Sequence, residues 1–207
     1  FPYTTLFRSK ALYSKAAVSV DGIEAFDNAA QIHLDKGEYG EAQTLLQQAC
    51  DLSGLSVPRL RALADVCEEN NDVEAATKAH RKVAKHGEYS MHSCADNNLD
   101  FARILSECAV RVGDVESKIL IAEALTAINK VNKSYQDKST KVRSTLLASQ
   151  AFSSIEENTK AHQLLDKALT GYHELNTFEK SVDVKVELVR TYVVTGLQDE
   201  AKALIGE

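Results

Sequence analysis

Gly37-Glu38-Tyr39-Gly40-Glu41-Ala42 decides the fold, because the pattern around this stretch returns 34 residues further along the chain. The matching positions, all at the same shift, are Phe26/Leu60, Ala30/Ala64, Gly37/Asn71, Tyr39/Val73, Ala42/Ala76 and Ala49/Val83. A repeat of this length is typical of a unit of two helices joined by a turn, which stacks on its neighbours to bury its apolar face. We therefore predict a helical repeat protein, whose stacked units form a surface for other molecules.

The composition favours helices and sets limits on the partners. The chain has 207 residues, with only 2 Pro and 9 Gly, the two residue types that interrupt helices. Its net charge is −6 and its pI is about 5.6, which argues against nucleic acid or anionic lipid as the main partner. No apolar run approaches the roughly 18 residues of a membrane helix.

Within the first two units, apolar and small residues recur three and four positions apart, as on one face of a helix. Gly37 supplies the end of the first helix, because glycine accepts the left-handed backbone conformation found there. Pro58 opens the second unit, since proline is tolerated in the first turn of a helix.

Later units keep this pattern with insertions. If Gly113 matches the turn between the two helices, Lys118 stands where a small alanine is expected. The shift from Ala76 to Lys118 is 42 residues, and we assign the extra eight to the loop 87–96. Ala161 and Ala201 mark two further units.

The expected fold is an all-α, right-handed superhelical solenoid of about five helix-turn-helix hairpins. The units are expected near residues 23–56, 57–90, 99–132, 142–175 and 182–207. The last unit is incomplete, so residues 199–207 are expected to fray, because terminal repeats normally carry a polar capping face.

Residues 1–9, FPYTTLFRS, resemble the translation of a common sequencing-adapter oligonucleotide. We interpret them as an artefact and exclude them from the fold. Residues 10–22 are then expected to be the remnant of an upstream helix or linker, in a fragment of a longer protein.

The motif at residues 37–49 resembles tetratricopeptide (TPR) repeats. Four longer strings are similar to the C-terminal repeat region of bacterial response regulators that carry a receiver domain before their TPR repeats. They are AVSVDGIEAF at 17–26, LSGLSVPRLR at 52–61, AHRKV at 79–83 and GEYSMH at 87–92. The resemblance implies a protein-interaction scaffold in a cytoplasmic two-component system. The receiver, with its phospho-accepting aspartate, would lie upstream, and no residue of this chain matches it.

No constellation in the sequence predicts catalysis, a cofactor or a metal. Phosphate-binding glycine loops and the G-x-S-x-G motif are both absent from the sequence. His86, His92 and Cys94 fit no zinc spacing, and we interpret them as ordinary loop residues. We expect His33 and His80 to be satisfied histidines of the helix interfaces.

The four cysteines form no Cys-x-x-Cys pair. Cys50 and Cys67 fall where side chains should face neighbouring helices, which is typical of reduced core thiols in a cytoplasmic protein.

The strongest indication of function in the sequence is a set of acidic residues on the first helices of the first two units. In this repeat class the first helix of each unit lines a groove, and eight residues of the first two units are expected to project into it. They are Glu24, Asp27, Gln31, Asp35, Arg61, Asp65, Glu68 and Glu69. Six carboxylates against one arginine would repel an acidic peptide, so the expected partner is a protein segment whose Lys or Arg residues flank apolar anchors. The alternative interpretation is that these acids only keep the surface soluble.

We therefore predict a non-catalytic protein-interaction scaffold. Two alternatives remain open: a structural module that self-associates through its repeats, and a helical ligand-binding or enzyme domain. The second alternative would require a closed pocket with convergent polar groups.

Overall fold

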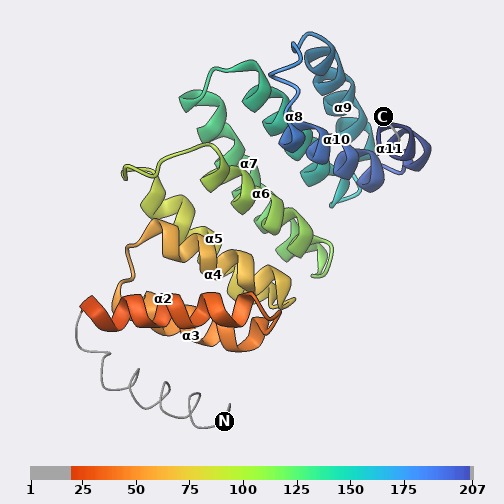
Figure 1. Ribbon diagram of the computed structural model, residues 1–207. Helices are drawn as coiled ribbons and strands as arrows, with labels where there is room; N and C mark the ends of the chain where they lie inside the picture. Colours follow the sequence, from red (N-terminus) through yellow and green to blue (C-terminus); the bar gives the residue numbers. More distant parts are fainter. Residues whose placement is uncertain (1–19, 206–207) are drawn as a thin grey trace. The chain divides into compact units, whose positions relative to one another are not determined.

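The structure is a computed structural model that describes residues 20–205 (Figure 1). Every regular element in that range is an α-helix, so the predicted all-α class is confirmed. Residues 1–9 and 10–19, for which we predicted an artefact and an upstream remnant, lie outside the described range, as do residues 206–207. The chain divides into two compact units, one ending at His92 and the other beginning at Ser93.

The described part of the first unit contains four helices that form two hairpins. They are α2 (Val20–Leu34), α3 (Tyr39–Leu52), α4 (Val57–Glu69) and α5 (Val73–Gly87). Helix α2 packs against α3, and α4 packs against α5. Helix α3 also packs against α4 and so joins the two hairpins.

The second unit contains, up to residue 205, six helices that form three hairpins. They are α6 (Asp96–Ala109), α7 (Asp114–Ser134), α8 (Lys138–Ser153), α9 (Asn158–His173), α10 (Val182–Val194) and α11 (Gln198–Ile205). Consecutive helices pair, and α8 additionally contacts α6, α7 and α10. Because helices surround α8, nine of its residues are buried. The hairpin architecture predicted from the sequence is confirmed.

One small buried residue recurs in the first turn of the second helix of every hairpin. These residues are Ala42, Ala76, Ser117, Ala161 and Ala201, and none is more than 5% exposed. The backbone N–H of each donates to the carbonyl four residues earlier, at 2.9 to 3.2 Å. A small side chain at this point lets the two helices of a hairpin approach closely. The shared burial and the shared bond show that these five residues occupy equivalent positions in their hairpins.

The third hairpin corrects the sequence-based alignment by one residue. Ser117 is buried at the small position, whereas Lys118 is exposed to solvent. The prediction that Lys118 replaces the alanine was therefore wrong. It failed because Gly113 was matched to Gly37, although Gly113 has φ −71 and is the N-cap of α7.

The turns between the paired helices explain why Gly113 is not equivalent to Gly37. In four hairpins the residue five positions before the small residue has a left-handed backbone, namely Gly37, Asn71, Glu156 and Gly196, with φ between 56 and 83. The following N–H then reaches the carbonyl five residues earlier, as from Glu38 to His33 at 2.9 Å. This is the closing bond of a Schellman motif, which ends the first helix and starts the second within a few residues.

Overpacking one close-approach site tests its importance. Replacing Ala161 by Leu should lower the unfolding free energy by about 1–3 kcal/mol, because the buried position has no space for three more carbons. The matched control is Ala122→Leu, at an exposed position of α7, which should change it by less than about 0.5 kcal/mol. Urea unfolding followed by far-UV circular dichroism measures both, and equal stability of the two variants would contradict the close-approach argument.

Candidate functional site

Helix α2 displays a polar face because its apolar face is occupied. Phe26, Ala29 and Ala30 are buried in the hairpin with α3. The predicted groove residues of this helix consequently face outward: Glu24, Gln31 and Asp35 are exposed, and Asp27 is half-buried. The side-chain amide of Gln31 donates to the Asp35 carboxylate at 2.9 Å, which steadies the end of the helix.

Asp27 is held by a residue that the sequence did not reveal. Arg59, in the first turn of α4, donates from Nε to Asp27 Oδ1 at 2.8 Å and from its terminal nitrogen to Oδ2 at 2.6 Å. This bidentate pair links α2 directly to α4, and the Arg59 side chain is largely buried. The hydrogen bond with Asp27 raises the pKa of Arg59. The separation of 32 residues, close to the repeat length, was the signal that could have indicated the pair.

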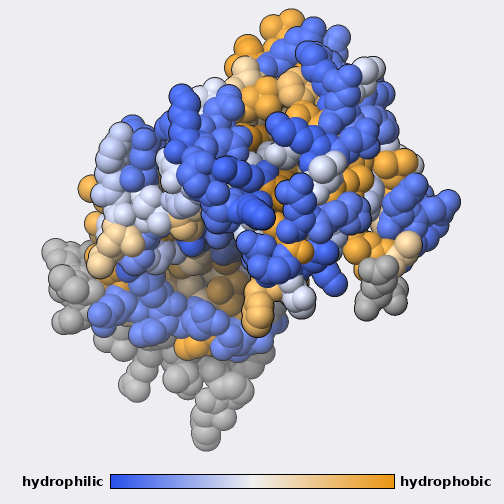
Figure 2. All heavy atoms as spheres, turned by 90° about the horizontal axis from the view of Figure 1, so that it is seen from above, coloured by the Kyte–Doolittle hydropathy of each residue, from blue (hydrophilic) through white to orange (hydrophobic). Residues whose placement is uncertain are grey.

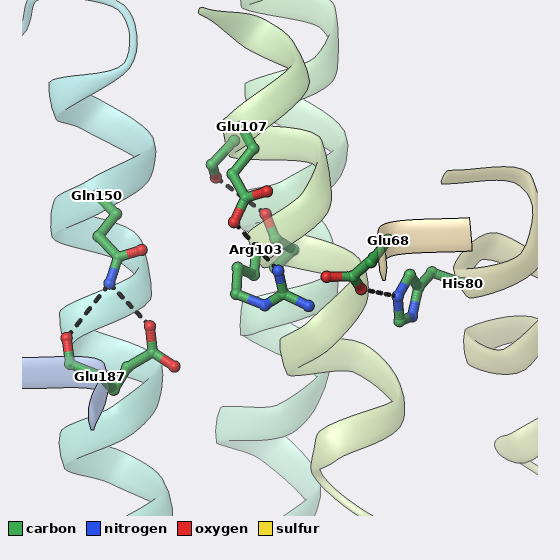
Figure 3. Close-up of polar contacts among 8 residues, drawn as sticks. Glu68, His80, Arg103, Glu107, Gln150 and Glu187 are labelled. Carbon is green, nitrogen blue, oxygen red and sulfur yellow. Dashed lines mark hydrogen bonds and ion pairs between the residues drawn. The ribbon is translucent and has the colours of Figure 1, made fainter. Parts of the chain in front are cut away.

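The predicted groove residues of α4 divide in a similar way. Asp65 and Glu69 are exposed, whereas Arg61 and Glu68 are half-buried. Glu68 Oε1 lies 2.6 Å from His80 Nε2, and Figure 3 shows the carboxylate directed at the imidazole ring. His80 is itself 3% exposed, so the prediction of a satisfied interface histidine is confirmed. His33 is half-buried and similarly contacts Glu38, at 2.6 Å.

An amide relay holds the two hairpins of this unit together. Asn70 donates to the side-chain oxygen of Gln43 at 2.6 Å, and the Gln43 amide donates to Asp72 Oδ2 at 2.6 Å. The other oxygen of Asp72 accepts from the N–H of Ala75 at 3.1 Å and caps α5. The outward acidic faces of α2 and α4 thus belong to hairpins tied by an ion pair and by this relay.

The second unit contains a different polar cluster, between α8 and α10. Gln150 donates its amide to Glu187 Oε1 at 2.8 Å (Figure 3). The same amide donates to Thr191 Oγ1 at 2.9 Å. All three residues are nearly fully buried. Burial raises the pKa of Glu187, although the hydrogen bond from Gln150 and the charges of Arg190, Arg143 and Arg103 oppose this effect. The cluster joins two helices and is closed to solvent, which favours a structural role.

Two further features bear on catalysis. A cleft of about 270 Å³ in the first unit is lined by Gln47, Leu63, Asp72, Glu74, Ala75, Lys78, Ala79 and Lys82. Among these lining residues none is a histidine, cysteine or serine, and the ionisable ones are Asp72, Glu74, Lys78 and Lys82. Within residues 20–205, no three His, Cys, Asp or Glu side chains gather as a metal site would require.

The buried thiols are protonated. Burial raises the pKa of Cys50 to about 11 and that of Cys67 to about 12. Cys94 and Cys108 are half-exposed, and none of the four cysteines forms a disulfide. A thiol reacts as its thiolate, so the two buried cysteines are far less reactive than ordinary thiols at neutral pH.

Comparison with known proteins identifies the fold. No family model and no curated protein sequence matches the chain. Among solved structures, the TPR-like repeats of a kinesin light chain from Podosopora anserina have a TM-score of 0.52 and 16% identity, covering 89% of this chain and 92% of that chain. BtubC from P. vanneervenii has a TM-score of 0.53 and 14% identity, covering 96% and 83% of the two chains. MamA has a TM-score of 0.50 and 14% identity, with coverages of 89% and 88%.

The fold is that of TPR-like repeats. At these identities the similarity concerns the arrangement of the helices alone. It confirms the repeat class predicted from residues 37–49 and leaves the resemblance to response regulators as a prediction. No described helix combines the length and the apolar character needed to cross a bilayer.

The buried carboxyl of Glu187 predicts a pH dependence of stability. Its folded-state pKa is raised above the unfolded value of about 4.3, so its contribution to stability is complete below that pH and is lost as the pH rises through the folded pKa. Glu187→Gln removes this titration. The variant should therefore gain stability relative to the wild type as the pH rises from about 4 to 7. Urea unfolding at a series of pH values measures the difference, and a pH-independent difference would contradict the prediction.

The thiols should fall into two classes of reactivity. In native protein near pH 8, a disulfide reagent such as DTNB should label Cys94 and Cys108 first, because they reach solvent. Cys50 and Cys67 should react at least about 100-fold more slowly, because the thiolate is scarce and enclosed. Labelling in denaturing urea, where all four should react alike, is the control. One common rate in the native protein would contradict the assignment.

Proposed function

We propose that this protein is a non-catalytic scaffold that binds another protein through the acidic outer faces of α2 and α4. The observation that carries the proposal is a set of exposed carboxylates: Glu24 on α2, Asp35 in the turn that follows it, and Asp65 and Glu69 on α4. The opposite faces of α2 and α4 are fixed in the core. The eight predicted residues contain six carboxylates and Arg61, and the structure adds Arg59 beside them. The face keeps a clear excess of negative charge.

The fixed arrangement of the two hairpins supports a role as a binding scaffold. The ion pair between Asp27 and Arg59 and the relay through Gln43 hold two hairpins of the first unit in one arrangement. A preformed surface reduces the ordering cost of binding, so a partner segment can be held by modest contacts. Ile32, about half exposed on α2, offers an apolar contact on the same helix.

The chemistry of the face defines the partner. Carboxylates at the rim of an interface attract a segment that carries Lys or Arg and repel an acidic one. The partner is a protein or peptide with basic residues that flank apolar anchors, and the negative charge disfavours nucleic acid and anionic membranes. No cofactor enters this mechanism, which consists of binding alone.

We also propose that the repeats belong to a bacterial response regulator of the cytoplasm, in which a receiver domain precedes Lys10. The strings at residues 17–26, 52–61, 79–83 and 87–92 support this placement, and the free cysteines suit a reducing compartment. In such a protein the state of the receiver would control access to the acidic face. The complete open reading frame tests the placement, since it either encodes a receiver upstream or does not.

Charge reversal at two exposed positions tests the acidic face. The double variant Glu24→Lys, Glu69→Lys avoids Asp27 and Glu68, whose carboxylates hold Arg59 and His80. The probe is a synthetic helical peptide with Leu anchors flanked by Lys, and its twin has Glu in place of each Lys. Wild-type protein should prefer the Lys peptide, and the double variant should bind it roughly tenfold more weakly by isothermal titration calorimetry.

The control reverses the same number of charges in the second unit, at Glu116 and Glu200, both exposed. This variant has the same net charge as the test variant and should bind the Lys peptide nearly as well as the wild type does. Equal weakening by both double variants, or equal binding of the two peptides, would overturn the proposal.

A further inference from the structure

The cleft of the first unit has an apolar interior and a charged margin. Three of its lining residues are apolar and reach solvent little, since Leu63 and Ala79 are buried and Ala75 is half-buried. The other five are polar, and they are Gln47 of α3, Asp72, which caps α5, and Glu74, Lys78 and Lys82 of α5. None of these residues belongs to the acidic face of α2 and α4, so the cleft is a separate surface.

The shape of the cleft distinguishes it from the rest of the surface. On the face that Figure 2 presents, hydrophobic residues form separate patches among hydrophilic ones, as on most proteins, and such patches alone do not mark a site. The cleft is a hollow of about 270 Å³. This volume lies just below the range of small-molecule sites, about 300 to 1,000 Å³, so the cleft suits a ligand of one or a few residues.

Three charged side chains of the cleft are available to a ligand. Glu74, Lys78 and Lys82 form no ion pair with any residue in the range 20–205. The fourth charged residue, Asp72, is already engaged, because its two carboxylate oxygens accept hydrogen bonds in the amide relay and in the cap of α5. The same relay fixes the position of α5 relative to α3, which carries the opposite wall.

The fold does not require these charges. Counted from the small buried residue of each hairpin, the positions of Glu74 and Lys78 are occupied by Val115 and Ile119 in α7 and by Thr159 and Gln163 in α9. All six side chains are exposed, so packing within the hairpin does not select a residue type there. The charges of α5 are therefore a property of this one hairpin.

The spacing of the charges defines the length of the ligand. Lys78 and Lys82 follow Glu74 by four and eight residues, which is about 6 and 12 Å along the helix axis, on one side of the helix. A free amino acid carries its ammonium and carboxylate on one carbon and is too short to reach both ends. In an extended chain, two side chains that are two or three residues apart span about 7 to 11 Å, which matches the spacing on α5.

We propose that the cleft binds an extended segment of a partner protein in which a basic and an acidic residue flank one or two apolar residues. The base of the segment lies beside Glu74, its acid lies beside Lys78 and Lys82, and an apolar side chain enters the cleft against Leu63. A segment with charges of one sign would leave one end of the cleft facing a like charge, which disfavours it. The site therefore takes a partner different from the basic one proposed for α2 and α4.

Two short capped peptides test the proposal. Lys-Pro-Leu-Asp and its reverse, Asp-Leu-Pro-Lys, both acetylated and amidated, carry their charges three residues apart, and proline favours the extended form. The wild-type protein should bind one of them with a dissociation constant below about 1 mM, and the amide NMR signals of residues 47 and 74–82 should shift. Pro-Leu-Lys-Asp, capped in the same way but with adjacent charges, and free leucine should both bind at least about tenfold more weakly.

Exchange of the two end charges tests the orientation of the segment. The double variant Glu74→Lys, Lys82→Glu keeps the net charge of the protein and reverses the order of charges along the cleft. It should therefore prefer the other of the two peptides by at least about tenfold. The control, Glu116→Lys with Lys133→Glu, makes the same exchange at two exposed positions of α7 and should keep the wild-type preference.

Filling the hollow tests the apolar contact. Ala75→Leu should abolish binding of both peptides, because the larger side chain occupies the cleft, whereas Ala122→Leu should bind as the wild type does. Absence of binding to wild-type protein, equal binding of all four ligands, or an unchanged preference after the exchange would each refute the proposal. The helical Lys peptide should bind every one of these variants with wild-type affinity, so its failure to bind would count against the acidic face alone.

Discussion

The close approach of two helices at one small buried side chain is the contact on which this structure depends. It occurs at Ala42, Ala76, Ser117, Ala161 and Ala201. Side chains in a packed interior leave almost no spare volume, so a small residue sets how near the paired helices lie. Once this distance is set, the side of each helix that faces its partner helix is also set. Helix α2 must turn Phe26 inward, and the acids at positions 24, 27 and 35 then face outward.

The sequence predicted the parts of this architecture that depend on local pattern. Ala42 and Ala76 were found from their spacing, and His80 from its place on an apolar face. The third hairpin was misread because serine can fill the space of an alanine, and because Gly113 caps a helix where Gly37 ends one. Asp27 was expected among the groove residues, but its partner Arg59 was not found. Such a pair depends on how neighbouring helices are placed, and no local rule supplies that information.

Charged and polar groups in this protein serve two distinct purposes. Asp27, Glu68 and Glu187 each have a partner on another helix, and these contacts fix the hairpins in place. Glu24 and Glu69 lie exposed on the same helices as the first two, three residues and one residue away from them. A surface acid beside a structural acid keeps a fixed position, because the helix that carries both cannot rotate. The acidic face therefore presents its charge in a defined pattern.

The amide of Gln150 fixes the axial register of α10. It binds two groups one turn apart, the Glu187 carboxylate and the Thr191 hydroxyl, and Thr191 in turn donates to the Glu187 carbonyl at 2.7 Å. A slide of one helical turn, about 5.4 Å, would separate the buried side chains of Gln150 and Glu187, whereas Thr191 would keep its bond to the Glu187 carbonyl of its own helix. Helix α10 therefore packs against α8 in a single axial register. The residues on the outer side of α10 therefore have fixed positions along the axis of α8.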